Sequence, residues 1–285
     1  MIYAISDIHG YYWEIYRWFD QMGNLAPFEN GENKLVLLGD YIDYGADSFK
    51  VLRLIHAAAL YLQDALVVLR GDHEEAFLEW LDRYGHPNMG VADMDGFPER
   101  NGWLQADSDT GYQTLRSFLE KEQWEFFSRI LPTANELTLN REAARMILDN
   151  HQEILTWLRS LPDYYETERQ IFVHAGIDER AHGRWQELTD SHIFVRKYPV
   201  STRYFLKDII AGHVAAAEAA GDPEHEGIYF DGASHYFIDG AVQETGKLLC
   251  LAYDEKNGRY YELLRTDRSP GKRNRIYGEL KPLGK

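Results

Sequence analysis

Apolar residues occur along this chain in short runs, each followed by polar residues and then by apolar side chains at helical spacing. Three such units occupy the first part of the chain, and their predicted strands are residues 2–6, 34–38 and 65–69. After the first strand, Tyr12, Ile15, Tyr16 and Phe19 recur three or four positions apart, which predicts an amphipathic helix. Successive strand–helix units predict a sheet with a parallel portion and helices packed on it.

The pattern changes after residue 84. Between 84 and 140 the periodicity weakens and Gly, Asp and Asn accumulate, which indicates an inserted helical cap and not a second domain. Helices are predicted at 111–119, 122–131 and 142–161, and further strands at 170–173, 208–211, 248–253 and 259–264. The turn at Asn257-Gly258 predicts that the last two strands form a hairpin. We therefore expect one domain over residues 1–265, followed by a polar, basic tail or surface strap over 266–285.

The amino-acid composition indicates which classes of protein this chain could belong to. The chain has 285 residues, 45% of them apolar, and a mean hydropathy of −0.47, as expected for a globular protein with one large core. The single cysteine, Cys250, excludes an intrachain disulfide framework and favours a reducing cytoplasm. Neither a secretory signal nor a long apolar run is present, so we expect no membrane spanning. The net charge of −16 opposes binding to long nucleic acid or an anionic membrane, although bound metal cations would allow small phosphorylated substrates.

Acidic and histidine side chains follow the predicted strands at the same structural position. They are Asp7 and His9, Asp40 and Asp43, Asp72 and His73, His174, and His213. Because the carboxyl ends of strands in open α/β sheets border one crevice, we expect these groups to converge there. Carboxylate and imidazole ligands without a thiolate suit Mn²⁺, Fe or Zn²⁺ better than Ca²⁺, which prefers an all-oxygen shell.

Each of these residue types also has an ordinary structural interpretation. An Asp after a strand is usually a helix cap or turn residue, which is the better interpretation of Asp47. A single His is more often a hydrogen-bonded polar residue than a ligand, and this applies to His56, His86, His151, His182 and His192. His235 could border the site, but a histidine within a strand is the better interpretation. Repetition of the pattern at five strand ends favours a metal site.

Five motifs contain these groups in a fixed order. They are SDIHG at 6–10, GDYIDYG at 39–45, RGDHE at 70–74, FVHAG at 172–176 and AGH at 211–213. As an ordered set they resemble the calcineurin-like metallophosphoesterases, and in particular the phosphoprotein phosphatase branch that includes bacterial serine/threonine phosphatases and diadenosine tetraphosphatases. Residues 103–119 and 151–176 are similar to the diadenosine-tetraphosphatase-like members. The resemblance implies an α/β fold of the α+β type, with two mixed β-sheets sandwiched by helices in four layers and a helical cap insertion.

The resemblance also implies a dinuclear metal centre. Its ligands would be Asp7, His9, Asp40, Asp72, His174 and His213. Asp7 and His9 would bind the first divalent ion, Asp40 would bridge both, and the remaining three would bind the second. Mn²⁺ is the expected metal, with Fe, Zn or Ni as alternatives. Two ions about 3.5 to 4 Å apart can share a water, which then becomes a hydroxide nucleophile.

Further roles follow from the same resemblance. His73 would be the general acid that protonates the leaving oxygen, and Asp43 would orient its imidazole. Arg196 stands where the family has a phosphate-binding arginine, although a surface charge beside Lys197 is an equally good interpretation. Tyr44 borders the same expected phosphate pocket.

The sequence departs from the family pattern at two of these positions. Asp72 stands where Asn is usual, and Tyr44 where Arg is usual. With Asp72, two divalent cations, three carboxylates and a hydroxide give a formally neutral centre, whereas Asn would leave one net positive charge. Loss of the arginine removes another positive charge. We therefore predict weak attraction of a dianionic monoester and a preference for a less charged diester or an anhydride.

Two classes of function remain open. The leading hypothesis is a metal-dependent hydrolase of phosphate esters or anhydrides that acts on a phosphorylated small molecule, a nucleotide such as a dinucleoside polyphosphate, or a phosphopeptide of a phosphoprotein. The alternative is a catalytically weakened member of the same fold that binds metal or a partner. The aromatic residues of the insertion are Phe97, Trp103, Tyr112 and Phe118. They could stack a base, but such residues more often build the core of the cap.

Overall fold

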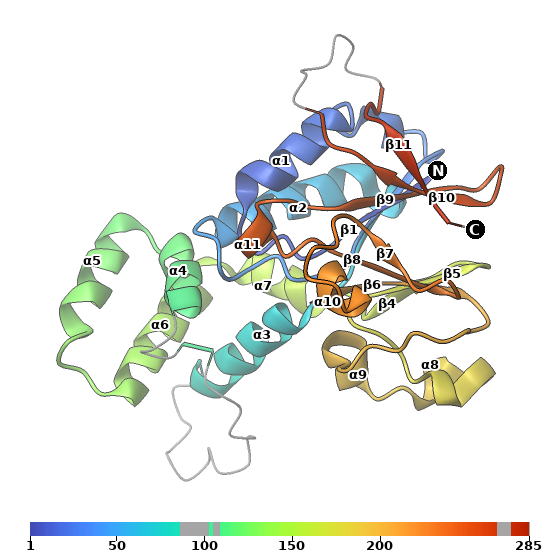
Figure 1. Cartoon of the computed structure of the whole chain (residues 1–285). Helices are drawn as coiled ribbons and strands as arrows, with labels where there is room; N and C mark the ends of the chain where they lie inside the picture. The colour runs from blue at the N-terminus through green and yellow to red at the C-terminus, as the bar shows by residue number, and fades with distance from the viewer. Residues whose placement is uncertain (86–102, 105–108, 267–274, 285) are drawn as a thin grey trace.

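Two mixed β-sheets form the centre of the computed structural model, and helices cover their outer faces (Figure 1). The structure describes residues 1–85, 103–104, 109–266 and 275–284. Within these residues the first sheet has six strands in the order β11-β10-β9-β1-β2-β3, and the second has five in the order β4-β5-β6-β8-β7. The predicted α/β fold with two sandwiched mixed sheets is confirmed.

The first sheet contains the three strand–helix units that the sequence predicts. Its strands are β1 (Ile2–Ile5), β2 (Lys34–Leu37), β3 (Leu66–Val68), β9 (Cys250–Asp254), β10 (Arg259–Leu263) and β11 (Leu280–Leu283). β1, β2 and β3 are parallel, whereas β9 pairs antiparallel with both β1 and β10. The predicted hairpin is therefore confirmed.

The second sheet carries the remaining predicted strand ends. Its strands are β4 (Tyr164–Glu166), β5 (Gln170–Val173), β6 (Asp208–Ala215), β7 (Tyr229–Phe230) and β8 (His235–Asp239). β5, β6 and β8 are parallel, and the register of β6 against β8 shifts between Ala211 and Ala215. This irregularity contains Gly212 and His213, so it coincides with a predicted ligand.

Helices enclose the two sheets and extend to one side of them (Figure 1). The longer ones are α1 (Tyr12–Gln21), α2 (Ser48–Leu62), α3 (Asp72–Tyr84), α4 (Asp109–Phe118), α5 (Lys121–Ile130), α6 (Glu136–Asn150) and α7 (Gln152–Arg159). The shorter ones are α8 (Trp185–Leu188), α9 (Ser191–Arg196), α10 (Ala216–Ala220) and α11 (Val242–Thr245). No helix among the described residues is long and apolar enough to span a bilayer.

The buried side chains form layers because successive residues of a strand point to opposite faces. In β1, Tyr3 and Ile5 pack against the helices, while Ile2 and Ala4 face the second sheet. In β5, Phe172 faces the first sheet, whereas its two neighbours pack outward with Trp185 and Phe194. A strand that is buried on both faces has apolar residues at consecutive positions. For this reason these strands could be predicted from the sequence.

One predicted helix is wrong. The sequence predicts a single helix over 142–161, but α6 and α7 are separate and meet at His151. His151 has φ −129°, outside the helical region, and its Nε2 lies 2.7 Å from the carbonyl oxygen of Phe118. This contact with α4 accompanies the change of chain direction at His151. The spacing of apolar residues does not reveal such a tertiary contact.

The insertion and the C-terminal segment are described in part. α4 and α5 match the two helices predicted there. α4 packs against α2 and α6 against α3, while α5 packs against α6 at the outer side of the molecule (Figure 1). Trp103, Tyr112 and Phe118 belong to the hydrophobic cluster that includes this region, whereas Phe97 and His86 lie outside the described residues. Within the segment expected as a tail or strap, β11 pairs with β10 at the edge of the first sheet, where Pro282 is tolerated.

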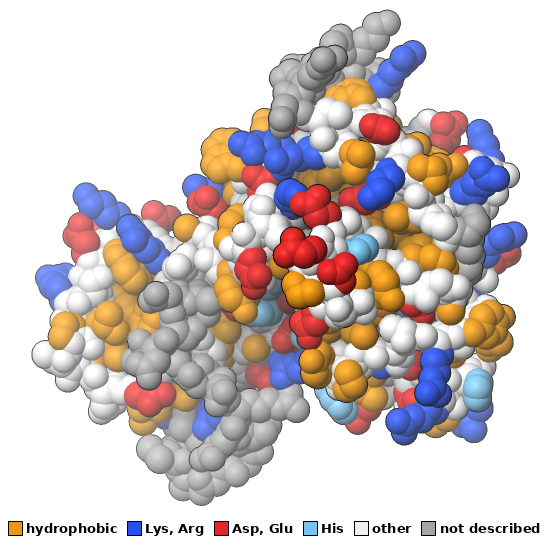
Figure 2. Space-filling model, viewed as in Figure 1, with side chains coloured by type: hydrophobic (Ala, Val, Ile, Leu, Met, Phe, Trp, Pro, Cys, Tyr) orange, Lys and Arg blue, Asp and Glu red, His pale blue; other side chains and the backbone are white. Residues whose placement is uncertain are grey.

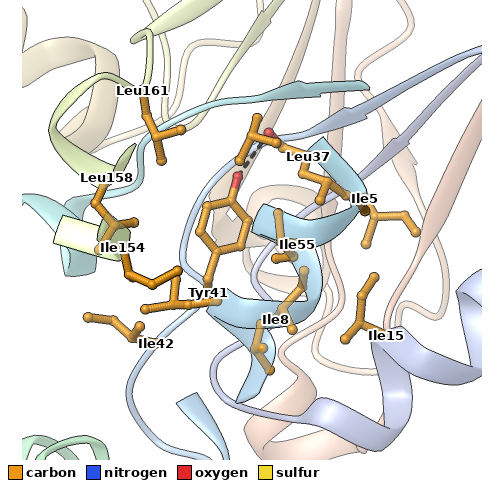
Figure 3. Close-up of a cluster of buried hydrophobic side chains, with 14 of the residues drawn as sticks. Ile5, Ile8, Ile15, Leu37, Tyr41, Ile42, Ile55, Ile154, Leu158 and Leu161 are labelled. Atoms are coloured by element: carbon orange, nitrogen blue, oxygen red, sulfur yellow. Dashed lines mark hydrogen bonds between the residues drawn. The ribbon is translucent and has the colours of Figure 1, made fainter. Parts of the chain in front are cut away.

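Tyr41 connects the ends of β2 and β3 beneath the strand-end loops (Figure 3). Its ring is fully buried, and its hydroxyl oxygen lies 2.7 Å from the carbonyl oxygen of Leu69 and 3.1 Å from that of Leu37. The same oxygen accepts the backbone N–H of Gly39 at 3.0 Å. One side chain therefore satisfies backbone groups of both strands.

We expect Tyr41→Phe to lower the free energy of unfolding by about 1–3 kcal/mol, because it leaves buried backbone groups without a partner. Urea denaturation of the metal-free protein measures the change. Tyr204→Phe, at a side chain that is 76% exposed, should change stability by less than about 0.5 kcal/mol. Equal midpoints for Tyr41→Phe and the wild type would show that the hydroxyl is not needed.

Candidate metal centre

The predicted site residues lie on strand-end loops with an unusual backbone. Eleven non-glycine residues in the described part of the chain have positive φ, and six of them are predicted site residues: Asp7, His9, Asp40, Asp43, Tyr44 and His213. Each such conformation costs on the order of 1 kcal/mol or more. Hydrogen bonds between loops compensate, since the backbone N–H groups of Ile8 and His9 both donate to the carbonyl of Asp40 at 2.8 and 2.9 Å.

Two glycines allow these loops to approach one another. A Cβ atom at Gly212 would lie 1.9 Å from Ser6 Oγ and 2.2 Å from Asp7 Oδ2. A Cβ atom at Gly71 would lie 2.1 Å from Asp40 Oδ1. No side chain fits at either position, so glycine is required by close packing against the carboxylates.

The first cluster of potential ligands surrounds one oxygen of Asp40. His174 Nε2 lies 3.4 Å from Asp40 Oδ1 and 3.3 Å from Asp72 Oδ1. His213 Nδ1 lies 3.1 Å from the same oxygen of Asp72. The ligand atoms of these four residues all lie within 4.8 Å of one another. They therefore come from both sheets and border one small space.

The second cluster uses the other oxygen of Asp40. His9 Nε2 lies 3.6 Å and His73 Nε2 3.9 Å from Asp40 Oδ2. Asp7 lies beside them, with its Oδ1 4.0 Å from His9 Nε2, and its carboxylate accepts the backbone N–H of His213 at 3.1 Å. Asp40 thus stands between two sets of ligand atoms, the arrangement that a bridging carboxylate requires.

Backbone carbonyls orient two of the histidine rings. His9 Nδ1 lies 3.0 Å from the carbonyl oxygen of Ile42, and His174 Nδ1 lies 2.9 Å from that of Leu38. A carbonyl can only accept, so each ring carries a proton on Nδ1, and its Nε2 faces Asp40. Metal-binding histidines are commonly held in this way.

The charges of the site fit a divalent cation. Burial raises the pKa of Asp40 to about 7 and that of Asp7 well above its usual value, because neither carboxylate is well solvated. Two further groups, Asp72 and Asp43, place negative charge within the same loops. A bound cation would stabilise the ionised carboxylates, and oxygen with imidazole nitrogen is a donor set that first-row divalent metals accept.

Glu74 fixes the loop that carries Asp40. Its side chain is fully buried, and its Oε2 accepts the backbone N–H groups of Asp40 at 2.9 Å and Gly71 at 3.0 Å. Its Oε1 accepts those of Tyr41 at 2.7 Å and Ile42 at 3.2 Å. The sequence shows Glu74 within the RGDHE motif, but spacing alone does not reveal this role.

Asp43 holds the ring of His73 and is itself held by the insertion. His73 Nδ1 lies 2.7 Å from Asp43 Oδ2. Trp103 Nε1 donates to the same oxygen at 3.0 Å, and Thr114 Oγ1 donates to Asp43 Oδ1 at 2.7 Å. Sequence reasoning missed both donors, because the contact depends on how the insertion packs against the site.

Tyr44 and Arg196 border the two clusters. The ring of Tyr44 is 4.8 Å from that of His9 and 5.4 Å from that of His73, centroid to centroid. Arg196 Nη2 lies 3.3 Å from the carbonyl oxygen of Asp72 and 3.0 Å from Glu75 Oε2. The predicted phosphate-binding arginine is therefore close to the site, but a carboxylate already accompanies it.

Comparison with known proteins agrees with this geometry. A family model described as calcineurin-like phosphoesterase matches residues 1–249. The chain belongs to the calcineurin-like phosphoesterase family. The resemblance predicted from the five ordered motifs is thereby confirmed.

Relatives within this family match a shorter part of the chain. A protein of Caenorhabditis elegans named as a serine/threonine-protein phosphatase is 38% identical over 73 residues, which cover 26% of this chain and 19% of the relative. The symmetrical bis(5'-nucleosyl)-tetraphosphatase of Nitrosospira multiformis is 34% identical over 73 residues, which cover 26% of this chain and 24% of the relative. The matches therefore span less than a quarter of each relative.

A solved structure shows the phosphoesterase fold over nearly the whole chain. The structure of a cold-active protein tyrosine phosphatase superposes with a TM-score of 0.52 at 14% sequence identity, covering 99% of this chain and 78% of the other. At this identity the likeness concerns the fold alone. It agrees with the sandwich of two mixed sheets.

A further acidic residue that the sequence analysis did not single out lies beside the candidate metal centre. Asp239 ends β8, is 6% exposed and accepts the backbone N–H of Ala241 at 2.7 Å. Its pairing with Ala215 places it beside the segment of β6 that carries His213. The strand-end rule, applied to DGASHYFIDG, would have identified it. His235, at the other end of β8, instead has its Nδ1 3.0 Å from Asp231 Oδ2.

Replacing Glu74 by Gln tests how the Asp40 loop is held. The amide nitrogen would face backbone N–H groups, so at least two hydrogen bonds are lost, and we expect a destabilisation of roughly 2–5 kcal/mol. Chemical denaturation of the metal-free protein measures it. Glu79→Gln is the matched control, because Glu79 is exposed on the same helix. If both variants unfold at the wild-type midpoint, the four N–H bonds contribute nothing.

Proposed function

We propose that this chain is a two-metal-dependent hydrolase of phosphate esters or anhydrides. The observation that supports this most strongly is the position of Asp40, whose two oxygens face separate clusters of ligand atoms. One ion would be held by Asp7, His9 and Asp40, and the other by Asp40, Asp72, His174 and His213. Mn²⁺ is the expected metal, with Fe, Zn or Ni as alternatives. When bound, the ions would lower the pKa of water and neutralise phosphate charge.

His73 would act as the general acid. Its Nδ1 is bound to Asp43, so its Nε2 points into the site, 3.9 Å from Asp40 Oδ2. Burial opposes protonation of His73, but the carboxylates of Asp40 and Asp43 outweigh burial and hold its pKa well above the usual value. Without bound cations the ring is therefore protonated, and as general acid it would give the proton on Nε2 to a leaving oxygen.

The substrate would be a phosphorylated small molecule, a nucleotide such as a dinucleoside polyphosphate, or a phosphopeptide. The names of the two relatives support both the nucleotide and the phosphoprotein classes. Long nucleic acid is an unsuitable partner for a chain with a net charge of −16. Cys250, the one cysteine, is fully buried, which suits the reducing cytoplasm that we propose as its compartment.

A weakened metal-binding or partner-binding protein is the second candidate. Arg196 is accompanied by Glu75 at 3.0 Å, and Tyr44 stands where the resemblance leads us to expect an arginine. On the face shown in Figure 2, acidic side chains gather near the centre of the molecule beside a histidine. The Glu75 carboxylate beside Arg196 and the net charge of −16 oppose the approach of a dianionic phosphate.

Metal removal distinguishes the two candidates. After chelation and dialysis, we expect Mn²⁺ to restore hydrolysis of at least one of p-nitrophenyl phosphate, bis-p-nitrophenyl phosphate, diadenosine tetraphosphate and a phosphopeptide. Asp40→Asn and His73→Ala should each lower kcat by about 100-fold or more, the loss typical of a missing general acid or metal bridge.

His192→Ala is the control, because His192 is an exposed histidine that belongs to neither cluster. It should retain wild-type turnover. Turnover that is independent of metal, or that survives Asp40→Asn, contradicts the two-metal proposal. Binding of two metal ions without turnover of any of the four substrates favours the weakened protein.

The charge of Asp72 provides a separate prediction. We expect Asp72→Asn to lower the KM for p-nitrophenyl phosphate relative to bis-p-nitrophenyl phosphate by roughly fivefold to tenfold, because removing one negative charge favours the dianion. Glu75→Gln should act in the same direction, because it removes the nearer of the two carboxylates beside Arg196. Metal content, measured by mass spectrometry, must stay at the wild-type level for the comparison.

Asp82→Asn is the matched control, since it makes the same change in net charge further along α3, at a side chain that is 48% exposed. A monoester-to-diester ratio unchanged in Asp72→Asn shows that this charge does not set the preference. A wild-type enzyme with a large preference for the monoester contradicts the argument as well.

A further inference from the structure

Helix α1 carries aromatic side chains on a face that the sequence pattern assigns partly to the core. Ile15 and Phe19 are buried as expected, and Trp18 is buried as well. Trp13 is 61% exposed and Tyr16 is 42% exposed, although the latter has core spacing. Contiguous exposed aromatic side chains indicate a binding surface more strongly than a single one does.

These rings are arranged as a continuous group. The rings of Tyr12 and Tyr16 are stacked with centroids 5.8 Å apart, and Trp13 meets Tyr16 edge to face at 5.8 Å. Such contacts hold the exposed rings in place, so their faces are available without a large loss of side-chain entropy on binding. A planar ligand could therefore stack on them.

An open groove of about 510 Å³ runs beside two of these rings, those of Tyr12 and Trp13. Its lining includes Tyr12, Trp13, Arg17, Tyr44, Asp47 and Gln113. Tyr44 also contacts the rings of His9 and His73. The groove therefore adjoins the candidate metal centre, and Tyr44 lies between the two.

The charges of the groove favour a neutral occupant. Arg17, the cation that lines the groove, has its Nη1 2.8 Å from Glu14 Oε1. The Oδ1 atom of Asp47 lies 2.5 Å from Lys50 Nζ, outside the lining, so the charged groups of the groove have partners of opposite sign. Aromatic faces and the exposed amide of Gln113 remain as recognition groups. A flat ring with hydrogen-bonding edges matches them, as in a nucleobase, and a second phosphate or an acidic peptide does not.

We propose that this groove binds the nucleoside part of a nucleotide substrate, with the base stacked on Trp13, whose ring Tyr16 contacts edge to face. The phosphate chain would pass Tyr44 and reach the ligands of Asp40. The volume of the groove lies in the range of small-molecule sites. This inference rests on the proposed function for the direction of the phosphate chain, but not for the binding of the base.

Binding of adenosine to the metal-free protein tests the groove directly. Saturation-transfer NMR should detect adenosine with the wild type and with Tyr61→Ala, and Trp13→Ala should raise the dissociation constant about fivefold or more. Tyr61 is the matched control because it is an aromatic side chain with the same 61% exposure, at the far end of α2. Absence of adenosine binding to the wild type, or equal binding to Trp13→Ala, overturns the proposal.

Kinetics with the Mn²⁺-loaded enzyme test the link to the metal centre. Trp13→Ala should raise the KM for diadenosine tetraphosphate, relative to that for p-nitrophenyl phosphate, by the factor measured with adenosine. An equal rise for both substrates, or a rise confined to a phosphopeptide, overturns the proposal. If no substrate is hydrolysed, the proposed function fails, and the adenosine measurement still decides whether the groove binds a nucleoside.

Discussion

The buried carboxylate of Asp40 is the constraint on which the candidate site depends. It lies between two histidine clusters in a place where burial raises its pKa to about 7, so the folded chain without a cation holds an unfavourable charge. The backbone that positions it is strained as well, with φ 56°. Glu74 and the paired loops hold this conformation through backbone N–H groups. The buried charge and the strained backbone of Asp40 therefore lower the stability of the fold, but they hold the candidate metal ligands in place before a metal binds.

The two sheets matter because neither one supplies a complete site. Asp7, His9, Asp40 and Asp72 follow strands of the first sheet, whereas His174 and His213 belong to the second. The residues between the sheets, such as Leu38, Leu69 and Ile210, set how close the two groups come. His213 lies within the register shift of β6, and its Nδ1 is directed toward Asp72. Such an irregularity changes the direction of a side chain relative to the regular alternation of a strand.

The sequence predicted those strands and site residues that are marked by a local pattern of apolar and polar residues. β1, β2, β3, β5 and β6 are apolar runs followed by Gly and Asp or His, and their convergence follows from parallel topology. β4 and β7 were not predicted because they are short and only partly buried, so no alternation marks them. The break at His151 and the donation of Trp103 and Thr114 to Asp43 depend on tertiary contacts, which one sequence does not display. Asp239 was within reach of the strand-end rule and was overlooked.

The charge of the candidate metal centre and the aromatic groove along Trp13 both affect how a phosphorylated substrate would bind. Asp72 in place of Asn, the Glu75 carboxylate beside Arg196, and Tyr44 in place of Arg all reduce the attraction that the centre can offer to a phosphate. An enzyme whose centre attracts phosphate weakly must obtain binding free energy from the rest of the substrate. The groove along Trp13 begins at Tyr44, the residue that replaces the expected arginine. An aromatic residue at this position lines the groove that holds Trp13, where the resemblance leads us to expect a phosphate-binding arginine, and this favours substrates recognised by more than their phosphate.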